Sequence, residues 1–281
     1  MTAALLALLA SFSWGTSDFL AGLESRRSTA WTAALGGQVV ASLSLLSLLV
    51  VSAPDQPPLA TLAAPALGGA IGSMGVVLQY RALALVDMSV VSPIIAGAAL
   101  VPLLWGTATG ERPGTLQLAG IVCTLAGIVL ISRKVRRTED EPESLDRRGV
   151  LLAVLSATAF GLFLVALDSG GEADPLYTVA VTRTTAVLTL LAVVVTARPV
   201  IRLRRRALPT LLVVGVLIAA ANLLFASATT SGYLSIVGVL GWLNPAITMA
   251  WAAAVLHERL RPLQVVAAAL VFAGIVCITV G

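Results

Sequence analysis

The sequence has 281 residues, of which 58% are hydrophobic and 11% are charged, and its formal net charge is +4. A soluble globular domain carries roughly 25% charged residues, and the mean hydropathy of +0.98 excludes that class here. Apolar runs of about 20 residues, in place of alternating segments of about 10, predict an all-α polytopic membrane protein and not a β-barrel.

Ten apolar segments are long enough to cross a bilayer, and charges, prolines or glycines separate them. We expect spans at about 2–22, 31–51, 60–80, 88–108, 114–132, 149–168, 175–197, 208–228, 234–256 and 263–280. One substantial connector, the charged segment 133–148, lacks the apolar residues needed to form a core. We interpret it as a solvated linker between two halves of the chain.

An internal repeat relates the two halves. At an offset of 147 residues, Glu111-Arg112 falls on Glu258-Arg259 and Ala126-Gly127-Ile128-Val129 falls on Ala273-Gly274-Ile275-Val276; at an offset of 146, Trp14-Gly15 falls on Phe160-Gly161. We therefore expect two five-helix domains, 1–132 and 149–281. Because five is an odd number, the second half starts on the opposite side of the membrane, which predicts an inverted repeat.

Arginine and lysine are divided unevenly between the two sides of the predicted membrane. The loops after spans 1, 3, 5, 7 and 9 hold Arg26, Arg27, Arg81, Arg133, Lys134, Arg136, Arg137, Arg147, Arg148, Arg198, Arg202, Arg204, Arg205, Arg206, Arg259 and Arg261. The other side holds only Arg112. Because cytoplasmic loops carry the excess of cations, we expect a multi-pass plasma-membrane protein with its linker in the cytoplasm and both termini outside.

The order of these features resembles the EamA-type drug/metabolite transporter superfamily over essentially the whole chain. The resemblance rests on the five-plus-five layout and on the segments YRALALVDMSVVSP, GERPG, VTRTTA and HERLRPLQ, followed by a closing helix with Ala-Gly-Ile-Val. It implies a secondary transporter that moves a small organic metabolite or drug-like solute through a central cavity by alternating access, with export as the expected direction.

Two features depart from that family's pattern. Family members often have both ends inside, whereas the loop charges here place both ends outside. The proline in the middle of the fourth repeat helix is present as Pro245, but its counterpart is Ala98, flanked by Pro93 and Pro102. The kink expected in span 9 therefore does not transfer directly to span 4.

Ionisable side chains inside a bilayer are costly, so they are the first candidates for function. Arg183, near the middle of span 7, is expected to line the solute cavity; a structural ion pair is the alternative. Asp18, the one acid well inside a predicted span, is the candidate for proton coupling, and pairing with Arg26 or Arg27 is its alternative. Because no intramembrane acid is placed to meet Arg183, an anionic or zwitterionic solute is expected to do so.

Further candidates for solute binding are Gln79, Ser92, Asn222, Asn244, Trp14 and Trp242. Helix–helix hydrogen bonding or simple packing is the alternative for each of them.

Other classes of function receive little support. The sequence has one histidine, no HExxH, GxSxG or P-loop motif, and no cluster suited to a metal, so we expect neither an enzyme nor a cofactor. The expected partners are the bilayer, a small solute and protons, without nucleic acid. A lipid or isoprenoid-carrier flippase and a non-transporting membrane subunit remain the alternatives.

Overall fold

The computed structural model describes residues 2–83, 85–86, 91, 94–132, 146–171, 174–255 and 262–280, and regular structure within these ranges is entirely helical. The helices are α1 (Thr2–Arg27), α2 (Ala30–Ser52), η1 (Leu59–Leu62), α3 (Ala63–Leu83), η2 (Gly97–Ala99), α5 (Leu100–Ala108), α6 (Thr115–Ser132), α7 (Arg147–Gly171), α8 (Pro175–Ala197), η3 (Arg205–Ala207), α9 (Leu208–Thr229), α10 (Leu234–Gly241), α11 (Asn244–Val255) and α12 (Pro262–Val280). Seven helical segments of the described chain are long and apolar enough to cross a membrane. Three shorter apolar helices accompany them, at 94–108, 115–130 and 266–280. The prediction of an all-α polytopic fold is confirmed.

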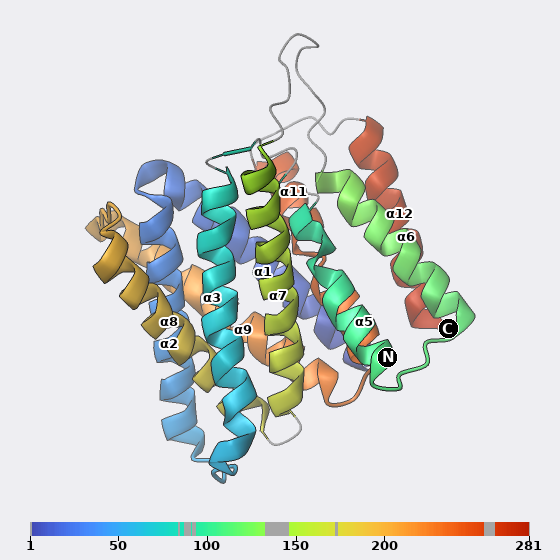
Figure 1. The fold of residues 1–281 in the computed structure, drawn as a ribbon, viewed down its shortest axis with the longest axis horizontal. Helices are drawn as coiled ribbons and strands as arrows, with labels where there is room; N and C mark the ends of the chain where they lie inside the picture. The colour runs from blue at the N-terminus through green and yellow to red at the C-terminus, as the bar shows by residue number, and fades with distance from the viewer. Residues whose placement is uncertain are drawn as a thin grey trace.

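The two ends of the chain lie on one face of the helical bundle, and the helices that border the linker meet the opposite face (Figure 1). Helix α1 rises from the lower edge of the view, whereas α7, its counterpart in the repeat, descends from the upper edge. This antiparallel relation is the one expected for halves of opposite orientation. Helix α7 starts at Arg147, slightly earlier than the sequence predicted, and residues 133–145 of the linker lie outside the described part of the chain.

Helices α2 and α8, which correspond in the repeat, begin and end in the same way. Thr29 caps α2 by accepting a hydrogen bond from the N–H of Thr32, and Asp174 caps α8 by accepting one from Tyr177. Each helix then ends at a left-handed residue, Ala53 with φ 40° and Arg198 with φ 47°, whose N–H closes the last turn. A proline follows each of these residues and prevents the helix from continuing.

Packing between the halves follows the same symmetry. Helix α3 packs on α7 and α8, and its counterpart α9 packs on α1 and α2. Glycines permit the close approach of α3 and α7, because a methyl group on Gly72 would lie 3.1 Å from Phe163 and one on Gly75 would lie 3.2 Å from Ala159. Helices α6 and α12 pair at the edge of the bundle (Figure 1).

The fourth span of each half contains a break in regular α-helix, although the second, Leu234–Val255, is still one membrane-length segment, as expected at 234–256. In the second half α10 ends at Gly241 and α11 starts at Asn244, with Pro245 in its first turn. In the first half, a 3-10 turn at Gly97–Ala99 precedes α5. The interruption therefore occurs in both halves, although only the second has the central proline.

Matching glycines on the first helix of each half support the two interruptions. A methyl group on Gly15 of α1 would lie 2.7 Å from the carbonyl oxygen of Asn244, and one on Gly161 of α7 would lie 2.7 Å from that of Ala98. Gly15 and Gly161 are the residues that the 146-residue offset equates. Each glycine thus lets a long helix pass directly over the irregular backbone of the other half.

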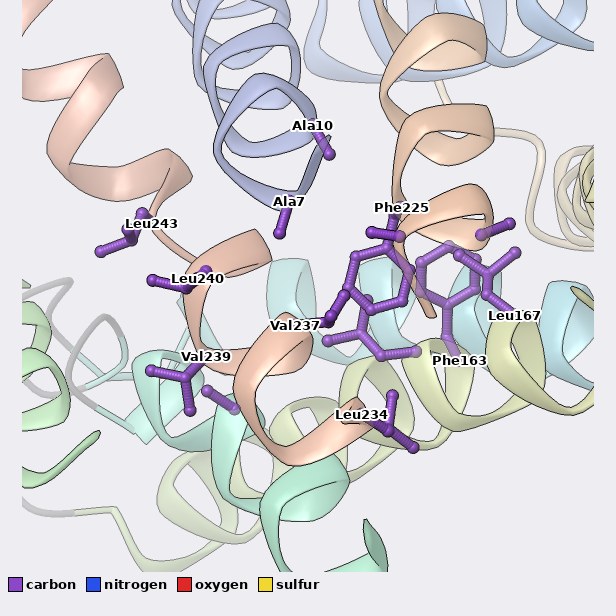
Figure 2. Close-up of a cluster of buried hydrophobic side chains, with 14 of the residues drawn as sticks. Ala7, Ala10, Phe163, Leu167, Phe225, Leu234, Val237, Val239, Leu240 and Leu243 are labelled. Atoms are coloured by element: carbon purple, nitrogen blue, oxygen red, sulfur yellow. The ribbon is translucent and has the colours of Figure 1, made fainter. Parts of the chain in front are cut away.

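The main apolar core lies around the short helix α10. In Figure 2, Val237 of α10 lies beside the ring of Phe225 of α9, and Leu234 and Leu240 extend from other sides of the same short helix. Leu167 and Phe163 of α7 complete this side of the cluster. The core thereby fixes α10 between α1, α7 and α9, and it places the end of α10 in the interior of the bundle.

Candidate functional site

The interruption between α10 and α11 is joined to α1 by polar side chains. The amide of Asn244 donates a 2.8 Å hydrogen bond to the carboxylate Oδ2 of Asp18. The hydroxyl of Thr248 donates a 3.0 Å bond to the carbonyl oxygen of Gly15, and the indole N–H of Trp251 donates a 2.9 Å bond to Thr16. Two predicted site residues, Asp18 and Asn244, are therefore in direct contact. Arg27, which is exposed, makes no ion pair with Asp18 in the described part of the chain.

Asp18 is exposed although it lies within a membrane-length helix. It shares one face of α1 with Ser11, Trp14 and Gly22, at helical spacings of seven, four and four residues. Ser11 is only 1% exposed, whereas a methyl group on Gly22 would meet nothing within 4 Å. This side of α1 is packed near the start of the helix and has free space near its C-terminal end. That end of α1 lies on the face of the bundle that borders the linker.

Aromatic rings surround the same interruption. The Trp14 ring lies 5.6 Å from that of Phe225, and the Phe160 ring lies 5.8 Å from that of Trp242, measured between centroids. A methyl group on Gly241 would lie 2.7 Å from the Phe225 ring, so a residue without a side chain is required where α10 passes this ring. Trp14 and Trp242, both predicted as site residues, thus lie at the end of α10. The indole N–H of Trp242 is buried and has no hydrogen-bond partner in the part of the chain that the structure describes.

Arg183 occupies a second polar position, on α8. Its Nη1 donates a 2.9 Å hydrogen bond to Oε1 of Gln38 on α2, and its guanidinium carbon lies 4.7 Å above the ring of Phe163. The side chain is 7% exposed, and its buried Nε has no hydrogen-bond partner among the described residues. Phe163 lies one helical turn from Phe160, so α7 contacts both Arg183 and the aromatic group at Trp242.

The remaining predicted site residues are placed differently. Asn222 on α9 is buried, donates to the carbonyl oxygen of Ile218 within its own helix, and leaves its Oδ1 without a partner. Gln79 is half-buried near the end of α3. Ser92 lies outside the described residues. Asn222 lies one helical turn before Phe225, which belongs to the aromatic group at the end of α10.

Several side chains in these contacts were not among the predicted site residues. Gln38, Phe160, Phe163 and Phe225 carry no charge, and in the sequence they are indistinguishable from residues that pack helices. The repeat offered one signal, because the 146-residue offset equates Phe160 with Trp14. Glu24, buried near the C-terminal end of α1, is a second acid within the membrane-length segment Thr2–Ser25, which extends three residues beyond the span expected at 2–22.

On the face that holds the chain ends, a carboxylate closes the start of α10. Glu111, in the connector between α5 and α6, accepts hydrogen bonds of 2.6 Å from the N–H of Leu234 and 2.9 Å from that of Ser235. A negative charge at a helix N-terminus is favourable because the first N–H groups have no partners within the helix. The first half of the chain therefore caps a helix of the second half.

Comparison with known proteins identifies the family. A model of the EamA-like transporter family matches residues 1–133 and again residues 147–280. The chain belongs to the EamA-like transporter family. This EamA-like protein is therefore a polytopic membrane transporter, and the interrupted helices, Asp18, Asn244 and Arg183 lie within the regions that the family match covers.

Solved structures agree with this fold. One of them, titled "Crystal structure of protein", is similar to the EamA-like chain with a TM-score of 0.82 and 17% sequence identity, over 99% of this chain and 96% of the other. No curated protein matches the sequence. Within the described ranges, no group of three or more His, Cys, Asp or Glu residues is placed to hold a metal ion.

Proposed function

We propose that the chain is a secondary active transporter that moves a small organic solute by alternating access, with Asp18 and Asn244 at the coupling site. The contact between these two residues carries the proposal. It joins an exposed carboxylate inside a membrane-length helix to the one amide that starts α11 after the interruption. An ionisable group in such a position is costly, so it marks a pathway for a solute or an ion.

The asymmetry of the bundle supports alternating access. The face of α1 that bears Asp18 is open toward the linker side, as the space at Gly22 indicates. On the opposite side, Glu111 holds the start of α10, and a methyl group on Gly238 of α10 would lie 2.6 Å from Pro102 of α5. The proposed state is open toward the linker, which the arginine and lysine distribution assigns to the cytoplasm.

The coupling role follows from what each side chain can exchange. A carboxylate takes up and releases a proton, whereas an amide does not, and the amide of Asn244 offers both a donor and an acceptor. The bond seen here, from the Asn244 amide to the Asp18 carboxyl, is the one that an ionised Asp18 accepts. A protonated Asp18 would instead donate to the amide oxygen, which is buried and has no partner within the described ranges. Protonation would thus rearrange the contact between α1 and α11.

Arg183 supplies the proposed site for the negative end of the solute. Its Nε has no hydrogen-bond partner, and a guanidinium binds carboxylates in a forked geometry. Asp18 lies one helical turn from Trp14, which pairs with Phe225, and Arg183 contacts Phe163, one helical turn from Phe160, which pairs with Trp242. This arrangement favours an anionic or zwitterionic solute with an apolar portion, and export is the proposed direction.

Reconstituted protein tests the proposal. Purified wild type and Asp18→Asn would first be screened by thermal shift against metabolites, because a ligand of the folded state raises its stability. The solute found would then be followed in liposomes under an imposed pH gradient. We expect wild type to accumulate it against its own gradient and Asp18→Asn only to equilibrate it. Uphill transport by Asp18→Asn, or scrambling of labelled lipid by wild type without solute movement, would contradict the proposal.

A further inference from the structure

The connector between α8 and α9 carries a dense positive charge that the transport site does not use. Arg198, Arg202, Arg204, Arg205 and Arg206 fall within nine residues and are all exposed, with no acidic residue among them. In the part of the chain that the structure describes, none of these arginines forms an ion pair. Within the described residues, no neighbouring acid neutralises their charge.

The connector is held in a fixed position on the bundle. The hydroxyl of Thr29 donates a 2.9 Å hydrogen bond to the carbonyl oxygen of Val200, and the N–H of Arg202 donates a 2.9 Å bond to Oγ1 of Thr32. Thr29 is the N-cap of α2, and Thr32 lies in its first turn. The backbone between Arg198 and Arg204 thus lies against the end of a membrane-length helix, and its side chains are displayed from a defined surface.

Apolar side chains alternate with the arginines along this backbone. Val200 is 61% exposed and Leu203 is 63% exposed, and Ile201 between them is also exposed. The connector leaves α8 after Ala197 and enters α9 at Leu208, so it lies where two spans reach the boundary of the bilayer. Aliphatic groups at that depth contact acyl chains while neighbouring arginines reach the headgroups.

We propose that residues 198–206 form a binding site for anionic phospholipid headgroups. Arginine binds phosphate oxygens through paired N–H groups, and basic segments beside a span attract anionic lipid. A freely dissolved anion would use the arginines but would gain nothing from Val200 and Leu203. The exposed aliphatic side chains therefore favour a lipid over a soluble phosphate. The site is independent of the solute pathway and does not rest on the transport proposal.

Purified full-length protein in neutral detergent provides the test. The lipid probe is phosphatidylglycerol, and the controls are phosphatidylcholine and inorganic phosphate of the same total charge. Native mass spectrometry measures the bound lipid, and thermal unfolding gives the melting temperature. Of the three compounds, we expect only phosphatidylglycerol to bind and to raise the melting temperature. Arg202→Gln with Arg204→Gln should lower its affinity by roughly 10- to 30-fold, and the effect should weaken in high salt.

Matched variants separate this site from general charge attraction. Arg147→Gln with Arg148→Gln removes the same charge from exposed positions at the start of α7 and should leave binding unchanged. Leu203→Ser keeps every arginine and should still weaken lipid binding, because it removes the acyl-chain contact. An equal loss in the α7 variant, full binding by the Arg202/Arg204 variant, or the same stabilisation by inorganic phosphate would overturn the proposal.

Discussion

The carboxylate of Glu111 accepts a 2.6 Å hydrogen bond from the backbone N–H of Leu234, so a connector in the first half caps a helix of the second. The N–H of Ser235 supplies a second bond to the same carboxylate. Helix α10 has only eight residues and carries much of the central core, so its start is a sensitive point. The contact spans 123 residues of sequence and ties the two repeats on the face that holds the chain ends.

Glu111→Ala should destabilise the protein by about 1–2 kcal/mol, because two N–H groups at the start of α10 lose their acceptor. Glu111→Gln keeps one acceptor oxygen and should lose less. Thermal unfolding of the purified protein in detergent measures both changes. Arg112→Ala, at the exposed neighbouring position, is the control and should melt like wild type. An unchanged melting temperature for Glu111→Ala would show that the cap contributes nothing.

Gly15→Ala should destabilise by about 1–3 kcal/mol, because the added methyl group would lie 2.5 Å from Cβ of Ile247 and 2.7 Å from the Asn244 carbonyl. Gly22→Ala is the matched control on the same helix, since its methyl group meets nothing within 4 Å. It should be neutral or slightly stabilising, as alanine favours a helix more than glycine does. Equal melting temperatures for the two variants would contradict the close passage of α1 over the interruption.

Much of the fold could be predicted from the sequence because its signals are long. Span-length apolar runs and the 146- and 147-residue offsets average over many positions, and they predicted the helices and the paired halves. The interruption of the fourth helices was only partly foreseen. Pro245 indicated it in the second half, but Gly97–Ala99 interrupts the first half without a central proline, and no local signal marks that turn.

The site was most predictable where a residue is costly in a bilayer. Asp18 and Arg183 stand out because charge in a bilayer is expensive. Asn244 was a candidate, but nothing in the sequence paired it with Asp18, 226 residues away, and nothing indicated Gln38, 145 residues from Arg183. A neutral amide at such a distance looks like any helix-packing residue. Three-dimensional packing decides which amide meets which charge, and a single sequence does not contain that information.

Arg183→Gln and Arg183→Lys should each reduce transport of a carboxylate-bearing solute at least tenfold. Glutamine removes the charge, and lysine loses the forked geometry that the guanidinium offers a carboxylate. Initial rates in liposomes measure transport, and thermal unfolding measures stability beside them. Melting temperatures near that of wild type would assign the loss to solute binding. Full transport by Arg183→Gln would rule out the role, and collapse of melting in both variants would assign Arg183 to the scaffold with Gln38.

The topology should follow the loop cations, with both termini outside. Alkaline phosphatase fused after Gly281 should be active and green fluorescent protein fused there should be dark, because each reporter works on only one side of the membrane. The same reporters inserted into the linker after Glu141 should give the opposite pattern. Fluorescence at Gly281 without phosphatase activity would reverse the orientation and, with it, the side to which Asp18 is open.

Water access to Asp18 tests most directly the claim that this residue lies in a solute pathway inside the membrane. Asp18→Cys would be made in a Cys123→Ala and Cys277→Ala background and treated, from the linker side, with a charged thiol reagent that does not cross membranes. Leu9→Cys, exposed on the opposite face of the same helix, is the control. We predict rapid modification of Asp18→Cys and none of Leu9→Cys, which faces lipid. An inert Asp18→Cys, or equal modification at both positions, would contradict the account.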